Sequence, residues 1–148
     1  MQSVRIEVTG GDDVAKMLGD LGREGGEAAK RVLIRKADKI LARARPLTPD
    51  DPATGSGDLK ASLRRTRGSI MKNGDVIITV IAGGAPLEAG LAARGHKGAN
   101  VYAIVQHEDL TLKHKHGGPK YLERPVYEIT PEIPNELQAE IDGLRMGA

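Results

Sequence analysis

The chain has 148 residues, a formal net charge of +2, 19 glycines and three tyrosines, and it contains no phenylalanine, tryptophan or cysteine. The lack of cysteine excludes disulfides and thiolate metal sites, and no segment has the roughly 18 apolar residues that a membrane span requires. We therefore expect a single domain over residues 1–148, made in a cytoplasm, with an aliphatic core and no membrane partner.

The N-terminal residues predict a strand and a short helix. Apolar and polar residues alternate over Val4–Thr9, which is typical of a half-buried strand. Asp12 or Asp13 can cap a helix whose apolar residues recur at helical spacing as far as Leu21. Gly22 is expected to end this helix.

The strongest helical pattern covers Glu27–Arg45. Leucine, isoleucine and alanine form a stripe along one face, and lysine and arginine occupy most of the remaining surface. Pro46 should end the helix, because a proline pushes the residue before it out of the α region. We expect this basic helix to be the spine of the domain.

A loop and a short helix are predicted next. Residues 46–57 hold three prolines and two glycines, which indicates an exposed loop. Ser56 or Asp58 can cap a short helix that turns Leu59 and Leu63 inward.

Asn73-Gly74 is a strong hairpin-turn pair. It joins a strand within Ser62–Lys72 to a strand over Asp75–Ala82 that is rich in β-branched residues. Gly83 to Asn100 is rich in glycine and alanine and predicts a loop, and Val101–Gln106 predicts another strand.

The C-terminal third begins with a polar loop over residues 107–118 and re-enters the domain at Pro119–Leu122. A short helix follows and should stop at Pro131, and Asn135 is expected to cap a last helix. These elements predict an α+β fold, with a small, mainly antiparallel sheet packed against one long basic helix and a short C-terminal helical tail. Mobile loops are expected at residues 46–57, 83–100 and 107–118.

Residues that could carry catalysis are sparse. No nucleophile elbow follows a strand, and no glycine pair leads into Gly-Lys-Ser/Thr, so we expect neither an enzyme nor a cofactor. One cluster has the chemistry of a zinc or manganese site: His107, His114 and His116, beside Glu108 and Asp109. Loops of this composition are usually just solvated, so a metal-dependent enzyme stands third among three hypotheses.

Charge is unevenly distributed along the chain. Lys30–Arg45 holds seven basic residues and one acid, whereas residues 121–148 hold six acids and two arginines. Such surfaces can be solvated faces, can meet between subunits, or can contact nucleic-acid phosphates. Without phenylalanine or tryptophan to stack on bases, nucleic-acid binding would be electrostatic and sequence-independent. The candidates for a subunit interface or a DNA channel are Arg35, Lys39, Arg43, Arg64, Arg65 and Arg67.

Four short motifs follow one another along the chain: Ala42–Pro46, Thr54–Ser62, Tyr102–Glu108 and Lys120–Pro125. In this order the chain resembles the tail-completion, or head–tail joining, proteins of long-tailed bacteriophages. That family has a long basic helix ending in proline, a Thr-Gly-x-Leu-x-x-Ser element, a Tyr-Ala-x-x-x-His/Glu strand and a closing Pro-x-x-Phe/Tyr-Leu-x-x-Pro segment. This chain departs from the pattern by two extra residues in the second element and by the insertion at residues 83–100.

The resemblance implies a structural virion protein. It would form a homo-oligomeric ring of six copies, with twelve as the second choice, at the head–tail junction or the top of the tail. The ring would join connector and head-completion proteins to tail-tube or tail-terminator proteins around the DNA channel, with non-specific contact to packaged DNA. The protein would be made in the host cytoplasm and reside in the neck or tail of the virion.

Roles for particular residues follow from the same resemblance. The six cations would line the channel or contact the acidic C-terminal segment of the next subunit. Tyr102 and Tyr121 would fill the core between sheet and helix. The loop histidines His107, His114 and His116 would contact neighbouring subunits. The alternative hypothesis is a sequence-independent nucleic-acid-binding protein that acts alone.

Overall fold

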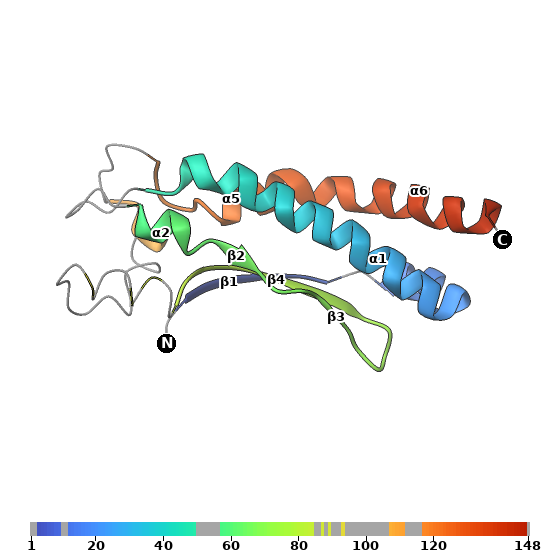
Figure 1. The fold of residues 1–148 in the computed structure, drawn as a ribbon. Coiled ribbons are helices and arrows are strands. Elements are labelled where there is room, and N and C mark those ends of the chain that lie inside the picture. Colours follow the sequence, from blue (N-terminus) through green and yellow to red (C-terminus); the bar gives the residue numbers. More distant parts are fainter. Residues whose placement is uncertain are drawn as a thin grey trace.

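The computed structural model describes residues 3–9, 12–49, 57–84, 87, 89, 93, 107–111 and 117–147. The chain has an α+β fold, as predicted (Figure 1). Its elements, in chain order, are β1 (Ser3–Thr9), α1 (Asp12–Leu47), α2 (Asp58–Ala61), β2 (Arg64–Arg65), β3 (Ser69–Ile70), β4 (Val76–Gly83), α5 (Glu123–Ile129), the 3₁₀ turn η2 (Thr130–Glu132) and α6 (Ile133–Met146). The predicted strand Val101–Gln106, which includes Tyr102, lies outside the described residues.

Within the described residues, β4 is the central strand of a four-stranded antiparallel sheet. β1 pairs along one side of β4 in a continuous register that sets Ile6 opposite Val80, and β2 and β3 share its other side. The hairpin between β3 and β4 turns at Asn73-Gly74, as predicted. The Met71 N–H donates to the Asp75 carbonyl at 2.7 Å, and Gly74 has a φ of 92°, which glycine adopts without steric cost.

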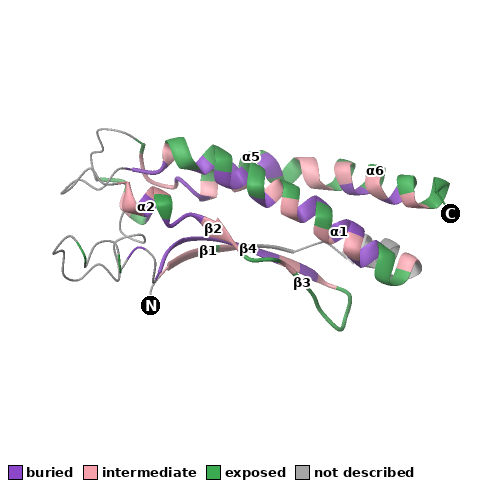
Figure 2. Cartoon of the chain, in the orientation of Figure 1, coloured by how far each residue is buried: buried purple, intermediate pink, exposed green. Residues whose placement is uncertain are grey.

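One face of the sheet packs against α1. Val76, Ile78, Val80 and Ala82 alternate along β4 and are all buried, because a strand turns every second side chain to the same face. Burial of each larger aliphatic side chain contributes about 1.5–3 kcal/mol. Buried residues recur along β4 and along α1 (Figure 2). Helix α1 supplies Ala29, Val32, Leu33, Ala37, Ile40, Leu41 and Ala44 to this core.

Helix α1 follows the prediction at Gly22 but not at Pro46. Gly22 has a φ of 57° and breaks the helix into two segments at the predicted position. The prediction that Pro46 ends the long segment is wrong, because the helix continues to Leu47. A proline this close to the C-terminus removes one N–H whose partner is the carbonyl of Ala42, an exposed residue that water can reach.

The predicted loop also begins later than expected. Thr48 and Pro49 are buried, and the Thr48 hydroxyl and N–H both donate to the Ala44 carbonyl, at 2.8 and 2.9 Å. These bonds satisfy a carbonyl that the end of the helix would otherwise leave unpaired.

Helix α2 forms where predicted and buries Leu59, and Leu63 follows it into the core. Its N-cap is Gly57, with a φ of 70°, and no side chain caps it. The predicted cap by Asp58 is therefore wrong, because Asp58 is already the first helical residue. Ser56 lies outside the described residues.

The C-terminal helices α5 and α6 lie alongside α1 on the same side of the sheet (Figure 1). α5 ends at Ile129, and Pro131 lies in η2. The helix therefore stops before this proline, as predicted. The predicted cap at Asn135 is wrong: α6 begins two residues earlier, at Ile133, with Pro134 in its first turn. Proline is favoured at that position because its fixed φ suits a helix. An N–H in the first turn has no partner within the helix, so its loss costs little.

None of the helices in the described part of the chain is both long enough and apolar enough to cross a membrane.

Candidate functional site

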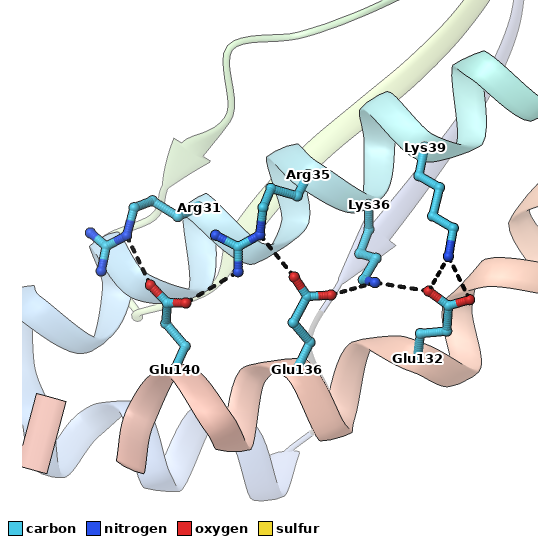
Figure 3. A network of polar contacts seen from close by, with 7 residues as sticks. All are labelled: Arg31, Arg35, Lys36, Lys39, Glu132, Glu136 and Glu140. Atoms are coloured by element: carbon cyan, nitrogen blue, oxygen red, sulfur yellow. Dashed lines mark hydrogen bonds and ion pairs between the residues drawn. The ribbon is translucent and has the colours of Figure 1, made fainter. Parts of the chain in front are cut away.

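The basic face of α1 is matched by a row of acids on residues 123–146, the C-terminal segment made of α5, η2 and α6. Each step of four residues along α1 corresponds to a step of four in the opposite direction along this segment, because residues four apart share one face of a helix. We call these contacts the charge ladder; its α6 end is shown in Figure 3. Its rungs are Arg31–Glu140 at 3.1 Å, Arg35–Glu136 at 2.8 Å, Lys39–Glu132 at 2.7 Å and Arg43–Glu128 at 3.0 Å.

Lys36 joins two rungs of the charge ladder. Its ammonium contacts Glu132 at 2.8 Å and also contacts Glu136. Its side chain is 11% exposed, against 46% for Arg35, so Lys36 is the better shielded of the two from solvent screening. Arg35 similarly spans two rungs by donating to Glu140 at 3.1 Å.

These contacts shift the pKa values of the ladder carboxyls downward. Hydrogen bonds from Lys36 and then Lys39 lower the pKa of Glu132 from 4.5 to about 2. The pKa of Glu136 is lowered mainly by Lys36, and that of Glu140 mainly by Arg31. Each shift means that the folded chain holds the ionised carboxylate more tightly than the unfolded chain does.

The charge ladder pairs Arg35, Lys39 and Arg43 with acids of their own chain. The resemblance implies that these residues line a channel or contact the acidic C-terminal segment of the next subunit. The acidic segment that they contact is the one in their own chain. Their charges therefore contribute to packing the C-terminal segment on α1.

The three arginines after α2 have different environments. Arg64 donates from Nη1 to the carbonyls of Ser62 at 3.0 Å and Gly83 at 2.7 Å. Arg65 donates from Nε to Asp38 Oδ1 at 2.6 Å, and this bond raises the pKa of Arg65. Arg67 is exposed, and it has no acid partner within the ranges that the structure describes. Within the described residues, Arg67 is the one of the six candidate cations that is exposed and makes no ion pair or side-chain hydrogen bond.

His107 is buried inside the domain, with 2% of its surface exposed. Its ring meets the ring of Tyr121 edge-on, with centroids 5.0 Å apart. The Glu123 N–H donates to His107 Nε2 at 3.3 Å, so Nδ1 carries the proton and donates to Glu108 at 2.7 Å. The expectation that His107 contacts a neighbouring subunit from an exposed loop does not fit this burial. His114 and His116 lie outside the described residues.

The polar groups around His107 contact one another and Lys120, and this arrangement does not suit a metal ion. Ligand atoms of His107, Glu108 and Glu123 lie within 4.8 Å of one another. However, the ammonium of Lys120 contacts both carboxylates, at 3.0 Å for Glu123, and both histidine nitrogens are engaged. A divalent cation would have to displace Lys120, whose contact lowers the pKa of Glu108, so these residues fit a metal poorly.

Residues of the Thr-Gly-Leu and closing motifs are buried. Leu59, Tyr121 and Leu122 have no exposed surface, and Ser62 has 2%. The Ser62 hydroxyl donates to the Leu59 carbonyl at 2.6 Å and accepts the Gly83 N–H at 2.8 Å, which ties α2 to the end of β4. The prediction that Tyr121 fills the core is confirmed.

Gly117 and Gly118 close the C-terminal end of α1. The Gly118 N–H donates to the Leu47 carbonyl at 3.0 Å. A Cβ atom at Gly117 would lie 2.5 Å from that carbonyl oxygen and 2.8 Å from the Pro49 nitrogen. The backbone of residue 117 thus approaches α1 too closely for any side chain.

The sequence did not lead us to single out the acids of the charge ladder. It also did not identify Asp38, the partner of Arg65, or Gly117. A signal for the ladder was present: acids recur every fourth residue from Glu128 to Glu140, and cations do so from Arg31 to Arg43. No comparable pattern marks Asp38 or Gly117, whose partners are distant in sequence.

No family model matches the chain, and no significant match was found among curated proteins or among solved structures.

Proposed function

We propose that the chain is a structural subunit of a ring at the head–tail junction, or at the top of the tail, of a long-tailed phage or phage-derived particle. There it joins the connector to the tail tube around the DNA channel. Six copies are preferred, with twelve as the alternative. The four motifs in family order and the α+β fold support this proposal.

One observation carries the proposal: in the second and fourth motifs, the described residues Leu59, Ser62, Tyr121 and Leu122 are buried within the fold. Leu59, Tyr121 and Leu122 lie in the buried core, and Ser62 ties α2 to β4. Residues of this kind specify a scaffold, so the function is assigned to the outer surface. A chain that contributes a surface rather than a reaction is what a ring subunit requires.

The charge ladder argues against the alternative that the protein acts alone by binding nucleic acid. Sequence-independent binding needs cations that can release counterions from phosphates. In α1, Arg31, Arg35, Lys36, Lys39 and Arg43 are already paired with carboxylates of the same chain. Their contribution to a phosphate-binding surface is correspondingly reduced.

Electron cryomicroscopy of the neck of the parent particle tests the proposal directly. The expected result is a closed ring of this chain between portal and tail tube. Its absence from intact particles would overturn the proposal and leave non-specific DNA binding as the leading function.

Arg67 is the sharper mutational probe of the ring surface. Reversal of Arg64 or Arg65 would also break contacts inside the fold, whereas Arg67→Glu removes no described ion pair. We expect Arg67→Glu to reduce the yield of joined particles. Arg145→Glu, at an exposed cation near the end of α6, is the matched control. Equal yields from both variants would exclude Arg67 from the subunit interface.

A further inference from the structure

Strand β1 forms one edge of the sheet within the described residues. All seven of its residues pair with β4 along one side, and within the part of the chain that the structure describes no strand pairs with the other side. The register is continuous, so no bulge interrupts the edge. The strand also contains neither lysine nor proline, two residues that commonly protect such edges. The N–H and C=O groups on this side of β1, which no described strand pairs with, are a template for another strand.

The sequence of β1, Ser-Val-Arg-Ile-Glu-Val-Thr, is self-complementary about its central residue, Ile6. In an antiparallel pair centred there, Ile6 meets Ile6 of the second copy. Arg5 of each copy stands opposite Glu7 of the other, and each Val4 stands opposite a Val8. The terminal hydroxyl residues, Ser3 and Thr9, meet in the same way. Opposite charges and β-branched residues placed directly across two strands both stabilise the pairing.

The structure places the residues of β1 consistently with this pairing. Val4 and Ile6 are partly buried and pack against the core, so a second strand would cover the surface that they still expose. Arg5 is exposed, and its register partner Ile81 is buried but is not part of the cluster against which Val4 and Ile6 pack. Arg5 donates from Nε to Ser3 at 3.0 Å and has no acid partner among the described side chains.

We propose that two copies of the free protein associate through β1, antiparallel and centred on Ile6. The two four-stranded sheets then form one continuous sheet across a two-fold axis, and the edge of β1 is closed. The contact is isologous, with the same residues contributed by both copies. This inference concerns the protein in solution and does not rest on the proposed ring, whose head-to-tail contacts would have no such two-fold axis.

Charge reversal tests both the contact and its register. Sedimentation velocity over a range of protein concentrations should show a monomer–dimer equilibrium for the wild-type chain. Arg5→Glu and Glu7→Arg each replace two attractive cross-strand pairs with two repulsive ones. We expect each single variant to raise the dimer dissociation constant roughly tenfold or more. The double variant Arg5→Glu/Glu7→Arg restores complementarity and should dimerise as the wild type does.

Mixing the two single variants is a further test. An Arg5→Glu copy carries glutamate at positions 5 and 7, and a Glu7→Arg copy carries arginine at both, so a mixed pair is complementary. We expect an equimolar mixture to form heterodimers at concentrations where each variant alone is monomeric. Circular dichroism of each variant checks that the fold is intact.

Three outcomes would overturn the inference. A wild-type chain that stays monomeric at every concentration would show that the edge is not closed by a second copy, and the chain's own residues 101–106 would become the first occupant to test. A dimer that is indifferent to both charge reversals would place the contact elsewhere. Larger oligomers that form equally well in both charge-reversal variants would also place the contact elsewhere. A ring in particles together with a monomer in solution would reject this inference and leave the proposed function standing.

Discussion

Lys39 donates from Nζ to both carboxylate oxygens of Glu132, at 2.8 and 2.7 Å, and so joins α1 to the turn between α5 and α6. Lys36 donates to the same carboxylate at 2.8 Å. Two ammonium groups on one carboxylate favour its ionised form, which is why the pKa of Glu132 falls to about 2. The attachment of the C-terminal segment therefore depends on pH.

Acid should weaken the folded state between about pH 5 and pH 2. The folded-state pKa of Glu132 lies below its ordinary value of 4.5, so the unfolded chain binds the proton more readily. The stabilisation is complete above the unfolded pKa and is lost as the pH falls toward the folded pKa. Urea unfolding at a series of pH values measures this loss, to which the lowered pKa values of Glu136 and Glu140 add.

Glu132→Gln isolates the part played by this carboxyl. The variant should be less stable than the wild type at neutral pH and should lose less stability on acidification. Glu24→Gln, at an exposed acid with no ion pair among the described residues, should retain the wild-type slope. If Glu132→Gln retained it too, the ladder would not be the source of the acid sensitivity.

Replacement of Gly117 by alanine should destabilise the fold by about 2 kcal/mol or more. Gly117 has a φ of 72°, and its added Cβ would collide with the backbone of residues 47–49. Gly118→Ala is the matched control, because its Cβ would meet no atom within 4 Å. Thermal unfolding should separate the two variants clearly. Equal stabilities would mean that the end of α1 can move away from residue 117 at little cost.

Removal of the Ser62 hydroxyl should cost about 1–3 kcal/mol, because the N–H of Gly83, a buried residue, loses its acceptor. The hydroxyl also donates to the Leu59 carbonyl, but that carbonyl keeps the Ser62 N–H at 3.1 Å in Ser62→Ala. Ser69→Ala, at an exposed position in β3, should change stability by no more than about 0.5 kcal/mol. Urea unfolding of both variants measures the difference. A neutral Ser62→Ala would show that water replaces the hydroxyl.

Release of the cations on α1 should increase the affinity of the chain for DNA. The triple variant Glu132→Gln/Glu136→Gln/Glu140→Gln removes the partners of Arg31, Arg35, Lys36 and Lys39. We expect tighter duplex binding by fluorescence anisotropy, with a salt slope steeper by about 0.9 for each further phosphate that the released cations neutralise. Circular dichroism must first show that the variant is folded. Equally tight binding by the wild type would mean that the ladder does not occupy these cations, and would favour the nucleic-acid alternative.

Local sequence patterns were sufficient for most of the fold. Alternation over Val4–Thr9, the apolar stripe of Glu27–Arg45 and the Asn73-Gly74 turn each predicted an element that the structure contains. They could do so because periodicity and turn chemistry act within a few residues of the chain. The wrong predictions concern helix ends, at Pro46 and Asn135. Packing and solvent access decide there at which residue a helix begins or ends.

The candidate site was predictable only in its residue types. Sequence identified a basic helix and an acidic C-terminal segment, but the spacing of four residues fixes only which face of each helix is charged. That spacing fits a partner in the next subunit as well as one in the same chain. The tertiary structure decides between them by folding α5 and α6 back onto α1.

Contacts between distant residues belonged to the tertiary structure alone. No sequence pattern predicts that His107 is buried against Tyr121. None predicts that the backbone of Gly117 approaches Leu47. Burial and close packing depend on which segments meet in space, and the sequence specifies this only through the sum of many weak interactions. The chain thus encodes its helices, strands and turn locally, whereas the pairing of its charges and the fit of its glycine arise only when those elements pack.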